Sequence, residues 1–287
     1  MMTRSAIGLV LAAALLSGCG SVSESVSGLG ESITGVGKPK EIEFEEAPPD
    51  QLYNEALVLM DTGNFKNAMI KFEEVDRLHP HTEYGRRAQV MMAFANYSRG
   101  QYDDAIVAAT RFVKLYPNHP DAPYAYYIIA NSYYKQIPDV TRDQAETEKA
   151  LQSYQALLDK YPDSEYAEDA RNKIQATKDQ IAGKEMEVGR YYLERDDNLA
   201  AINRFRVVVE KYQTTRHVEE ALFRLTESYY ALGVTSEAQT AAAVLGHNFP
   251  DSRWYKDAYD LLQTGGYSPS ESRTSWISRA FLGFDIL

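Results

Sequence analysis

Residues 161–170 read YPDSEYAEDA, and this ten-residue segment recurs in altered form four more times along the 287-residue chain. The other copies are HPHTEYGRRA (79–88), YPNHPDAPYA (116–125), YQTTRHVEEA (212–221) and FPDSRWYKDA (249–258). In all five an alanine stands eight residues after the second position, which is proline except in the fourth copy, where it is Gln213. Proline cannot continue a helix, and a following Ser, Thr or Asp caps the next one. Each copy therefore predicts a helix end, a turn and a new helix.

A second pattern precedes these turns. In the first repeat this pattern consists of Ala56, Gly63, Phe65, Ala68, Phe72 and Pro80. In the second repeat it consists of Ala93, Gly100, Tyr102, Ala105, Phe112 and Pro117. The fifth repeat keeps Tyr229, Gly233, Ala238 and Pro250. Small residues let paired helices approach closely, glycine ends the first helix, and aromatic residues fill the gap to the next pair. The pattern resembles the tetratricopeptide repeat.

The repeats predict an all-α fold, a tetratricopeptide-repeat solenoid of five helix pairs over residues 49–264. The third pair has an expanded turn, QIPDVTRD (136–143), and the fourth begins with a long helical pattern over 164–195. We interpret this long segment as the spine between an N-terminal group (49–162) and a C-terminal group (163–264). An irregular helical bundle is the alternative, and the regular recurrence of the turn disfavours it.

The N-terminus has the pattern of a bacterial lipoprotein signal peptide. Arg4 precedes an uncharged apolar run, IGLVLAAALL (7–16), which is about half the ~20 residues that a membrane-spanning helix needs. The sequence Leu-Ser-Gly-Cys that ends at Cys19 resembles a lipobox. We predict that residues 1–18 are removed and that Cys19 carries diacylglycerol and an N-acyl chain. An incidental or buried cysteine is the alternative.

The residue after the lipobox cysteine predicts the destination. Asp there usually retains a lipoprotein in the inner membrane, whereas this chain has Gly20. The resemblance therefore implies a protein anchored by lipid in the outer membrane and facing the periplasm. Residues 20–37 contain five Gly and five Ser, so we predict that residues 19–48 form a flexible, lipidated tether.

Charge and motifs exclude several classes of function. A net charge of −11 argues against nucleic acid as a partner and against adsorption to anionic lipid, so membrane attachment depends on the anchor. The chain contains no phosphate-binding glycine loop, zinc-protease motif or nucleophile elbow. His79 and His81 lack Cys or carboxylate partners at ligand spacing. We expect no catalytic site, no metal and no cofactor besides the lipid on Cys19.

Aromatic residues are the candidates for binding. The 21 tyrosines are far above the usual share, and tetratricopeptide arrays line a concave groove with the first helix of each pair. The repeat frame puts seven residues on this surface: Tyr53, Met60, Phe94, Tyr97, Tyr124, Tyr127 and Tyr134. Such a groove suits an extended peptide with alternating large apolar side chains. For any single residue, packing between repeats is an equal alternative.

The last segment, residues 265–287, contains a short amphipathic stripe. Its apolar members at helical spacing are Trp276, Ile277, Ala280, Phe281 and Phe284. We expect this tail to pack on the last repeat, with docking on a partner as the alternative.

Two segments resemble the BamD family, the lipoproteins of the outer-membrane β-barrel assembly machine. They are RYYLERDDNLAAINRFR (190–206) and TRDQAETEKALQSYQALLDKYPDS (141–164). The resemblance implies a non-enzymatic scaffold whose C-terminal repeats bind the barrel protein BamA, beside accessory lipoproteins. It also implies that the N-terminal repeats receive unfolded outer-membrane proteins.

Within these segments, Arg195 and Arg204 are the candidate BamA contacts. An internal ion pair, for example with Glu194, is the alternative, and it weighs more for Arg195 than for Arg204. Two other kinds of lipoprotein compete with the assembly role. One is a pilotin that escorts a secretin or pilus subunit, and the other is a scaffold that coordinates a cell-wall enzyme.

Overall fold

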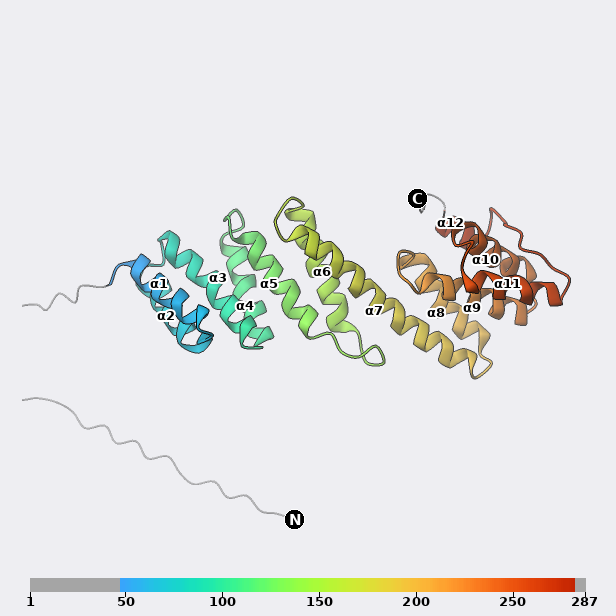
Figure 1. The fold of residues 1–287 in the computed structure, drawn as a ribbon, viewed down its shortest axis with the longest axis horizontal. Coiled ribbons are helices and arrows are strands. Elements are labelled where there is room, and N and C mark those ends of the chain that lie inside the picture. Colours follow the sequence, from blue (N-terminus) through green and yellow to red (C-terminus); the bar gives the residue numbers. More distant parts are fainter. Residues whose placement is uncertain (1–46, 282–287) are drawn as a thin grey trace, which may run out of the picture. The chain divides into compact units, whose positions relative to one another are not determined.

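The computed structural model describes residues 47–281, and this range contains helices and turns without a strand (Figure 1). The first five helices are α1 (Pro49–Asp61), α2 (Phe65–Leu78), α3 (Glu83–Ser98), α4 (Tyr102–Leu115) and α5 (Ala122–Lys135). Then come α6 (Ala145–Lys160), α7 (Ala167–Leu193), α8 (Asn198–Lys211), α9 (Val218–Ala231) and α10 (Thr235–Asn248). The last two are α11 (Arg253–Thr264) and α12 (Trp276–Phe281). The predicted signal peptide, Cys19, nearly all of the tether and Phe284 lie outside the described residues.

Helices α1 to α10 form five consecutive pairs, so the predicted all-α tetratricopeptide-repeat solenoid is confirmed. Each helix packs on its chain neighbours, and the first helices of successive pairs also meet, as α1 with α3 and α3 with α5. One difference concerns the end of the array. The fifth pair stops at Asn248, and α11 is an unpaired helix that packs on α9 and α10.

Glycines in the left-handed region end the first helix of three pairs. Gly63, Gly100 and Gly233 have φ of 73°, 75° and 73°. The amide that follows each glycine reaches back five residues, as when Asn64 N donates to Leu59 O at 2.8 Å. This is the hydrogen bond of a Schellman turn, in which a side chain at the glycine position is disfavoured. In the fourth pair Asp196 takes this position, with φ 58°.

The second kind of turn, predicted from the proline segments, is capped less regularly than expected. Thr82 accepts a hydrogen bond from Gly85 N (3.0 Å), and Ser252 accepts one from Trp254 N (3.2 Å). The residues at the N-cap of α5, α7 and α9 are Asp121, Tyr166 and His217, and none of their side chains forms a capping hydrogen bond. The prediction of a Ser, Thr or Asp cap is therefore right for the first and last segments and wrong for the three between them.

Small residues lie where the paired helices are closest. The repeat alanines Ala56, Ala68, Ala93 and Ala105 are fully buried, and large aromatic side chains such as Phe72 fill the space beside them. Residues from α7 to α12 form one continuous apolar cluster, while the earlier pairs form three smaller ones. Burying this apolar surface supplies the main favourable term in folding.

The long helix α7 contributes to both halves of the array. It has 27 residues, so it spans about 40 Å at 1.5 Å per residue. Ala170 near its start packs in the cluster of the third pair, and Met186 near its end packs in the C-terminal cluster. The expanded turn of the third pair braces its middle, because Gln180 donates to Pro138 O (3.1 Å) and Lys184 to Thr141 O (2.6 Å).

The described part of the tail lies on the C-terminal pairs. Helix α12 packs against α10 and α8, with Ile277 fully buried. Trp276 Nε1 donates to the hydroxyl of Tyr229 at 3.1 Å, and Gln213 Nε2 donates to Ala280 O at 2.6 Å. Up to Phe281 the tail therefore packs on the last repeat, as its apolar stripe predicts.

Candidate functional site

Five rings from α3, α5 and the turn before α7 form a continuous cluster, which we call the aromatic row: Phe94, Tyr97, Tyr124, Tyr127 and Tyr166. Tyr166 stacks on both tyrosines of α5, with ring centroids 5.4 Å from Tyr124 and 4.8 Å from Tyr127. Phe94 of α3 lies 6.0 Å from Tyr124 and 6.5 Å from Tyr97. Four of the seven predicted groove residues are thus in contact with one another.

The hydroxyls of the aromatic row stay neutral and available as hydrogen-bond donors. Burial raises the pKa of Tyr97 and Tyr124, and neighbouring tyrosines add to the increase. Burial also raises the pKa of Tyr127, whose hydroxyl donates to Asp169 Oδ2 at 2.7 Å. The row therefore combines half-buried apolar faces with polar edges, a combination that suits protein interfaces.

A cavity of about 220 Å³ lies beside the row. Its walls come from the turn before α5 and the turn before α7, and they include Asp121, Tyr124, Ser164 and Tyr166. The buried hydroxyl oxygen of Ser164 has no hydrogen-bond partner among residues 47–281. The cavity has room for one apolar side chain, and Ser164 offers a polar contact to its backbone.

The structure overturns the placement of two predicted groove residues. Tyr53 and Met60 are only 8% and 7% exposed and belong to the core of the first pair. The ring of Tyr53 packs edge-on against Phe72 at 5.4 Å and lies 5.6 Å from Tyr84. Their prediction as surface residues is wrong because both side chains pack into this core, where Tyr84 of α3 lies against Tyr53.

Tyr134 lies apart from the aromatic row. Its ring contacts the buried Tyr154 at 6.1 Å, and the ammonium of Lys173 lies 4.3 Å above it. This arrangement ties α5 to α6 and α7. The role of Tyr134 in binding remains a prediction.

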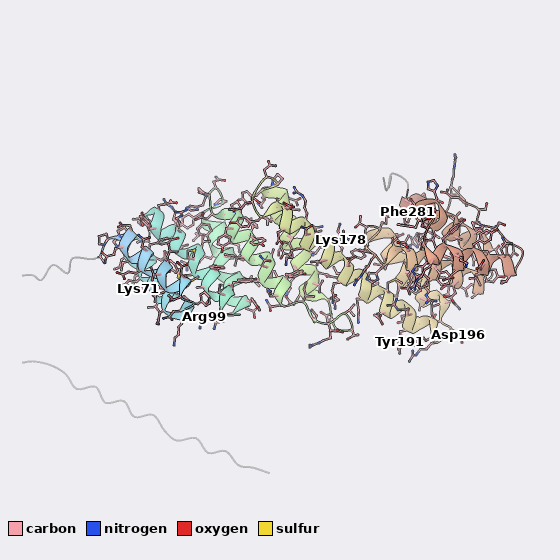
Figure 2. The ribbon with its side chains drawn as sticks, in the orientation of Figure 1. Lys71, Arg99, Lys178, Tyr191, Asp196 and Phe281 are labelled. Atoms are coloured by element: carbon pink, nitrogen blue, oxygen red, sulfur yellow. The ribbon has the colours of Figure 1, made fainter. Side chains whose placement is uncertain are left out.

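A second exposed feature lies at the opposite end of α7, which we call the α7–α8 tip: Tyr191, Arg195, Asp196 and Leu199. The guanidinium carbon of Arg195 stacks 3.6 Å from the ring centre of Tyr191, and Nη1 donates to Tyr191 O at 3.2 Å. Tyr191 is 50% exposed and Leu199 66%. Tyr191 and Asp196 mark the tip in Figure 2. An exposed aromatic ring, an arginine and a leucine are typical anchors of protein interfaces.

The internal ion pair that the sequence suggests for Arg195 is formed by Arg204 instead. Arg204 Nη1 forms an ion pair with Glu185 Oε2 of α7 at 3.3 Å. Arg195 forms no ion pair within the described residues, and its guanidinium makes a cation–π contact with the ring of Tyr191. The sequence favoured an internal ion pair for Arg195 over one for Arg204. The pair forms at Arg204 because α8 packs Arg204 against the carboxylate-bearing face of α7.

Sequence reasoning missed four residues of these surfaces. Tyr166 stands within YPDSEYAEDA as the N-cap residue of α7, and its position in a turn gives no sign that its ring stacks on α5. Asp196 has an unfavourable backbone conformation at the position where other repeats have glycine. Aligning the turns of the repeats in the sequence would have shown this replacement of glycine by aspartate. Tyr191 and Leu199 lie within the quoted segment 190–206, and only their exposure distinguishes them from core residues.

Within residues 47–281 no group of three or more His, Cys, Asp or Glu is arranged to hold a metal ion. His79 Nε2 lies 3.1 Å from Ala47 O, so this histidine takes part in anchoring the start of α1. In the same range no helix is both long and apolar enough to cross a membrane.

The sequence of this chain is similar to those of known proteins. The YfiO family, described as an outer membrane lipoprotein, matches residues 45–245. An outer membrane protein assembly factor BamD from Caulobacter vibrioides is 46% identical over 264 residues, which cover 92% of this chain and 82% of that protein. BamD from Rickettsia prowazekii is 42% identical, with coverages of 76% and 86%, and BamD from Xylella fastidiosa is 33% identical, with 73% and 75%. The chain belongs to the YfiO family, whose relatives here are outer membrane protein assembly factors named BamD.

Proposed function

We propose that this chain is a non-enzymatic scaffold for the assembly of outer-membrane β-barrel proteins. Cys19 carries the lipid that anchors it in the outer membrane, and the repeats face the periplasm. The α7–α8 tip binds a BamA-like barrel protein, and accessory lipoproteins join the same assembly. The aromatic row receives unfolded outer-membrane proteins. The relatives named outer membrane protein assembly factor BamD support this proposal.

The observation that carries the proposal is the pair of unlike surfaces at the two ends of α7. At its start, Tyr166 belongs to the aromatic row and Asp169 accepts the hydrogen bond from Tyr127, while Tyr191 and Arg195 belong to the tip at its end. At 1.5 Å per residue the ends are about 40 Å apart, so two partners can bind at once. A scaffold that passes a substrate to a second protein needs such a separation.

The aromatic row fits an extended chain. Successive residues on one face of a β-strand lie about 6.6 Å apart, close to the spacing of rings along the row. Rings in the row are separated by 4.8 to 6.5 Å. An unfolded barrel strand alternates apolar and polar side chains, so its apolar face can lie on these rings.

The tip fits a folded partner with a carboxylate. Arg195 is exposed, free of internal ion pairs in the described structure, and held by the ring of Tyr191. Holding an arginine in place lowers the entropy lost when it pairs with a partner's Asp or Glu. Arg204 lies nearby in the chain but already has Glu185 as a counter-charge.

Co-purification of the lipoprotein from detergent-solubilised membranes tests the proposed role. We expect a BamA-like barrel protein to be recovered with the wild type and lost with Arg195→Glu. Recovery of a secretin or a cell-wall synthase without any such barrel contradicts the assembly role and supports a pilotin or a wall-coordinating lipoprotein.

A charge swap separates the two possible roles of Arg204. Arg204→Glu places two carboxylates together, so it weakens barrel recovery whether the role is internal or direct. Adding Glu185→Arg restores the internal ion pair with its polarity reversed. If Arg204 contacts the partner, recovery stays low in the double variant. If recovery returns to the wild-type level, Arg204 only supports the packing of α8 on α7.

A further inference from the structure

The second helix of the second pair carries an open apolar groove, which we call the α4 groove. It has a volume of about 650 Å³ and follows one stripe of α4 from 106 to 115, with Tyr133 of α5 at its side. Val107 is 69% exposed and Leu115 53%. Neither the aromatic row nor the α7–α8 tip includes this surface.

The groove has a counterpart in the C-terminal half of the chain. Helices α4 and α8 have 14 residues each and begin 96 residues apart, at Tyr102 and Asn198, and α5 and α9 begin with the same separation. The buried alanines Ala105 and Ala201 agree with this register. Thr110 therefore corresponds to Arg206, and Tyr133 to Tyr229.

The counterpart groove is occupied by the chain's own tail. Arg206 lies 4.7 Å from the ring of Trp276, and Tyr229 accepts the hydrogen bond from Trp276 Nε1 at 3.1 Å. Ser275 Oγ donates to Glu237 of α10 at 2.6 Å. Within the described residues, this face of a repeat is covered by a helix only in the C-terminal half. There the covering element is a short amphipathic helix.

The charges around the two grooves are opposite. Glu210, which shares a small pocket with Arg279 of the tail, corresponds to Lys114 in the α4 groove. Glu237 corresponds to Lys149, because the buried Ala238 and Ala150 follow each directly. In the C-terminal groove, Glu210 is paired with Arg206 at 2.8 Å and Glu237 accepts a hydrogen bond from the tail, so the side chains beside Arg279 include carboxylates. The α4 groove has Arg111 and Lys114 in its lining instead.

The positive charge of the α4 groove is largely uncompensated. Arg111 and Lys114 line it and form no ion pair within residues 47–281. Lys149 pairs with Glu146 at 2.9 Å and lies 5.7 Å above the ring of Tyr133. The acidic residues of α4 itself, Asp103 and Asp104, lie in its first turn, and Asp103 is close enough to act electrostatically on Lys149.

We propose that the α4 groove binds a short amphipathic helix of a partner protein. The helix places aromatic and aliphatic side chains on Val107, Leu115 and Tyr133, and it carries an acidic residue where the tail carries Arg279. The tail of a second copy is disfavoured, because its Arg279 meets Lys114. The inference is independent of the roles of the aromatic row and the tip.

Two fluorescent peptides copied from residues 272–281 test this groove, one native and one with Arg279→Glu. Each is titrated with the mature lipoprotein in detergent, with protein-free micelles as the blank, and anisotropy is measured. Replacing a repulsive pair by an attractive one at an exposed site favours the Arg279→Glu peptide by about five-fold. Lys114→Glu reverses the order of the two peptides.

Val107→Asp abolishes binding of both peptides, because it places a carboxylate in the apolar stripe. Val58→Asp is the matched control, since Val58 is 62% exposed on α1 and lies outside the groove. Binding that survives Val107→Asp overturns the proposal, because the peptide then occupies the C-terminal groove or the micelle. Absence of binding at about 1 mM, equivalent to roughly −4 kcal/mol, also overturns it.

Discussion

The two ends of α7 carry surfaces that are built differently. At its start, the rings of the aromatic row support one another, and Tyr127 is held by Asp169. At its end, Arg195 stacks on Tyr191, whose ring also meets Tyr192 edge-on at 5.7 Å, and the chain turns through Asp196 in the left-handed region. The row is therefore part of the fold as well as a proposed binding surface. The tip is exposed, so changes there should alter binding with little effect on stability.

The largest expected effect is on folding. Tyr124→Ala removes a ring that lies between Phe94 and Tyr166, so we expect a loss of about 2–3 kcal/mol in the free energy of unfolding. Tyr191→Ala should change it by less than about 0.5 kcal/mol, because this ring is half exposed. Urea unfolding followed by circular dichroism measures both. Equal losses contradict the contrast between the two ends.

The next effect is on binding at the tip. Arg195→Glu should reduce recovery of the barrel partner about ten-fold, since about 1.4 kcal/mol corresponds to a factor of ten. Arg195→Lys should give an intermediate value, because lysine keeps the charge and loses the planar stack on Tyr191. Arg99→Glu, an exposed reversal at the end of α3, is the control. Quantitative co-purification decides, and a loss as large in the control removes the assignment to Arg195.

A smaller effect is expected from the backbone of the tip. Asp196→Gly should stabilise the fold by about 1 kcal/mol, because glycine has no side chain to strain at φ 58°. The reciprocal change, Gly233→Ala at the equivalent turn of the fifth pair, should destabilise by a similar amount. The urea midpoints of the two variants should move in opposite directions. A midpoint unchanged by Asp196→Gly means that the aspartate side chain compensates the strain.

The smallest effect concerns pH and the middle of α7. Burial lowers the pKa of His217, nearby Arg216 and Arg190 lower it further, and Asp179 and Glu220 act in the opposite direction. The imidazole Nε2 has no hydrogen-bond partner within the described residues, and it lies close to Gly183 of α7. The unfolded chain therefore binds a proton more readily, so stability falls as the pH drops below about 6.5.

His217→Gln should reduce this decline between neutral and mildly acid pH. His81→Gln, at an exposed position, is the control and should leave the decline as it is in the wild type. Urea midpoints at several pH values make the comparison. An unchanged pH dependence in His217→Gln means that another group causes it.

Local patterns predicted most of the fold. The proline segments and repeat alanines correctly predicted the ten paired helices, and the predicted span 164–195 exceeds α7 by only a few residues at each end. The caps of α5, α7 and α9 were not predictable, because the backbone turn replaces the side-chain cap there. The unpaired α11 was also missed, since the fifth proline segment leads into a single helix rather than a pair.

The candidate sites were less predictable than the fold. A repeat frame places a side chain on a face of its own helix, but burial depends on which neighbour covers that face. Tyr84 covers Tyr53, whereas nothing in the described structure covers Val107. The same limit applies to ion pairs, because the partner of Arg204 lies 19 residues away on another helix.

One experiment tests the division of labour along α7 most directly. Wild type, Tyr97→Ala and Arg195→Glu are each assayed for crosslinking to a C-terminal peptide of an unfolded outer-membrane protein and for recovery of the barrel partner. We predict that Tyr97→Ala reduces only the crosslinking and Arg195→Glu only the recovery. If either variant reduces both to the same extent, the two surfaces do not act separately and the account is contradicted.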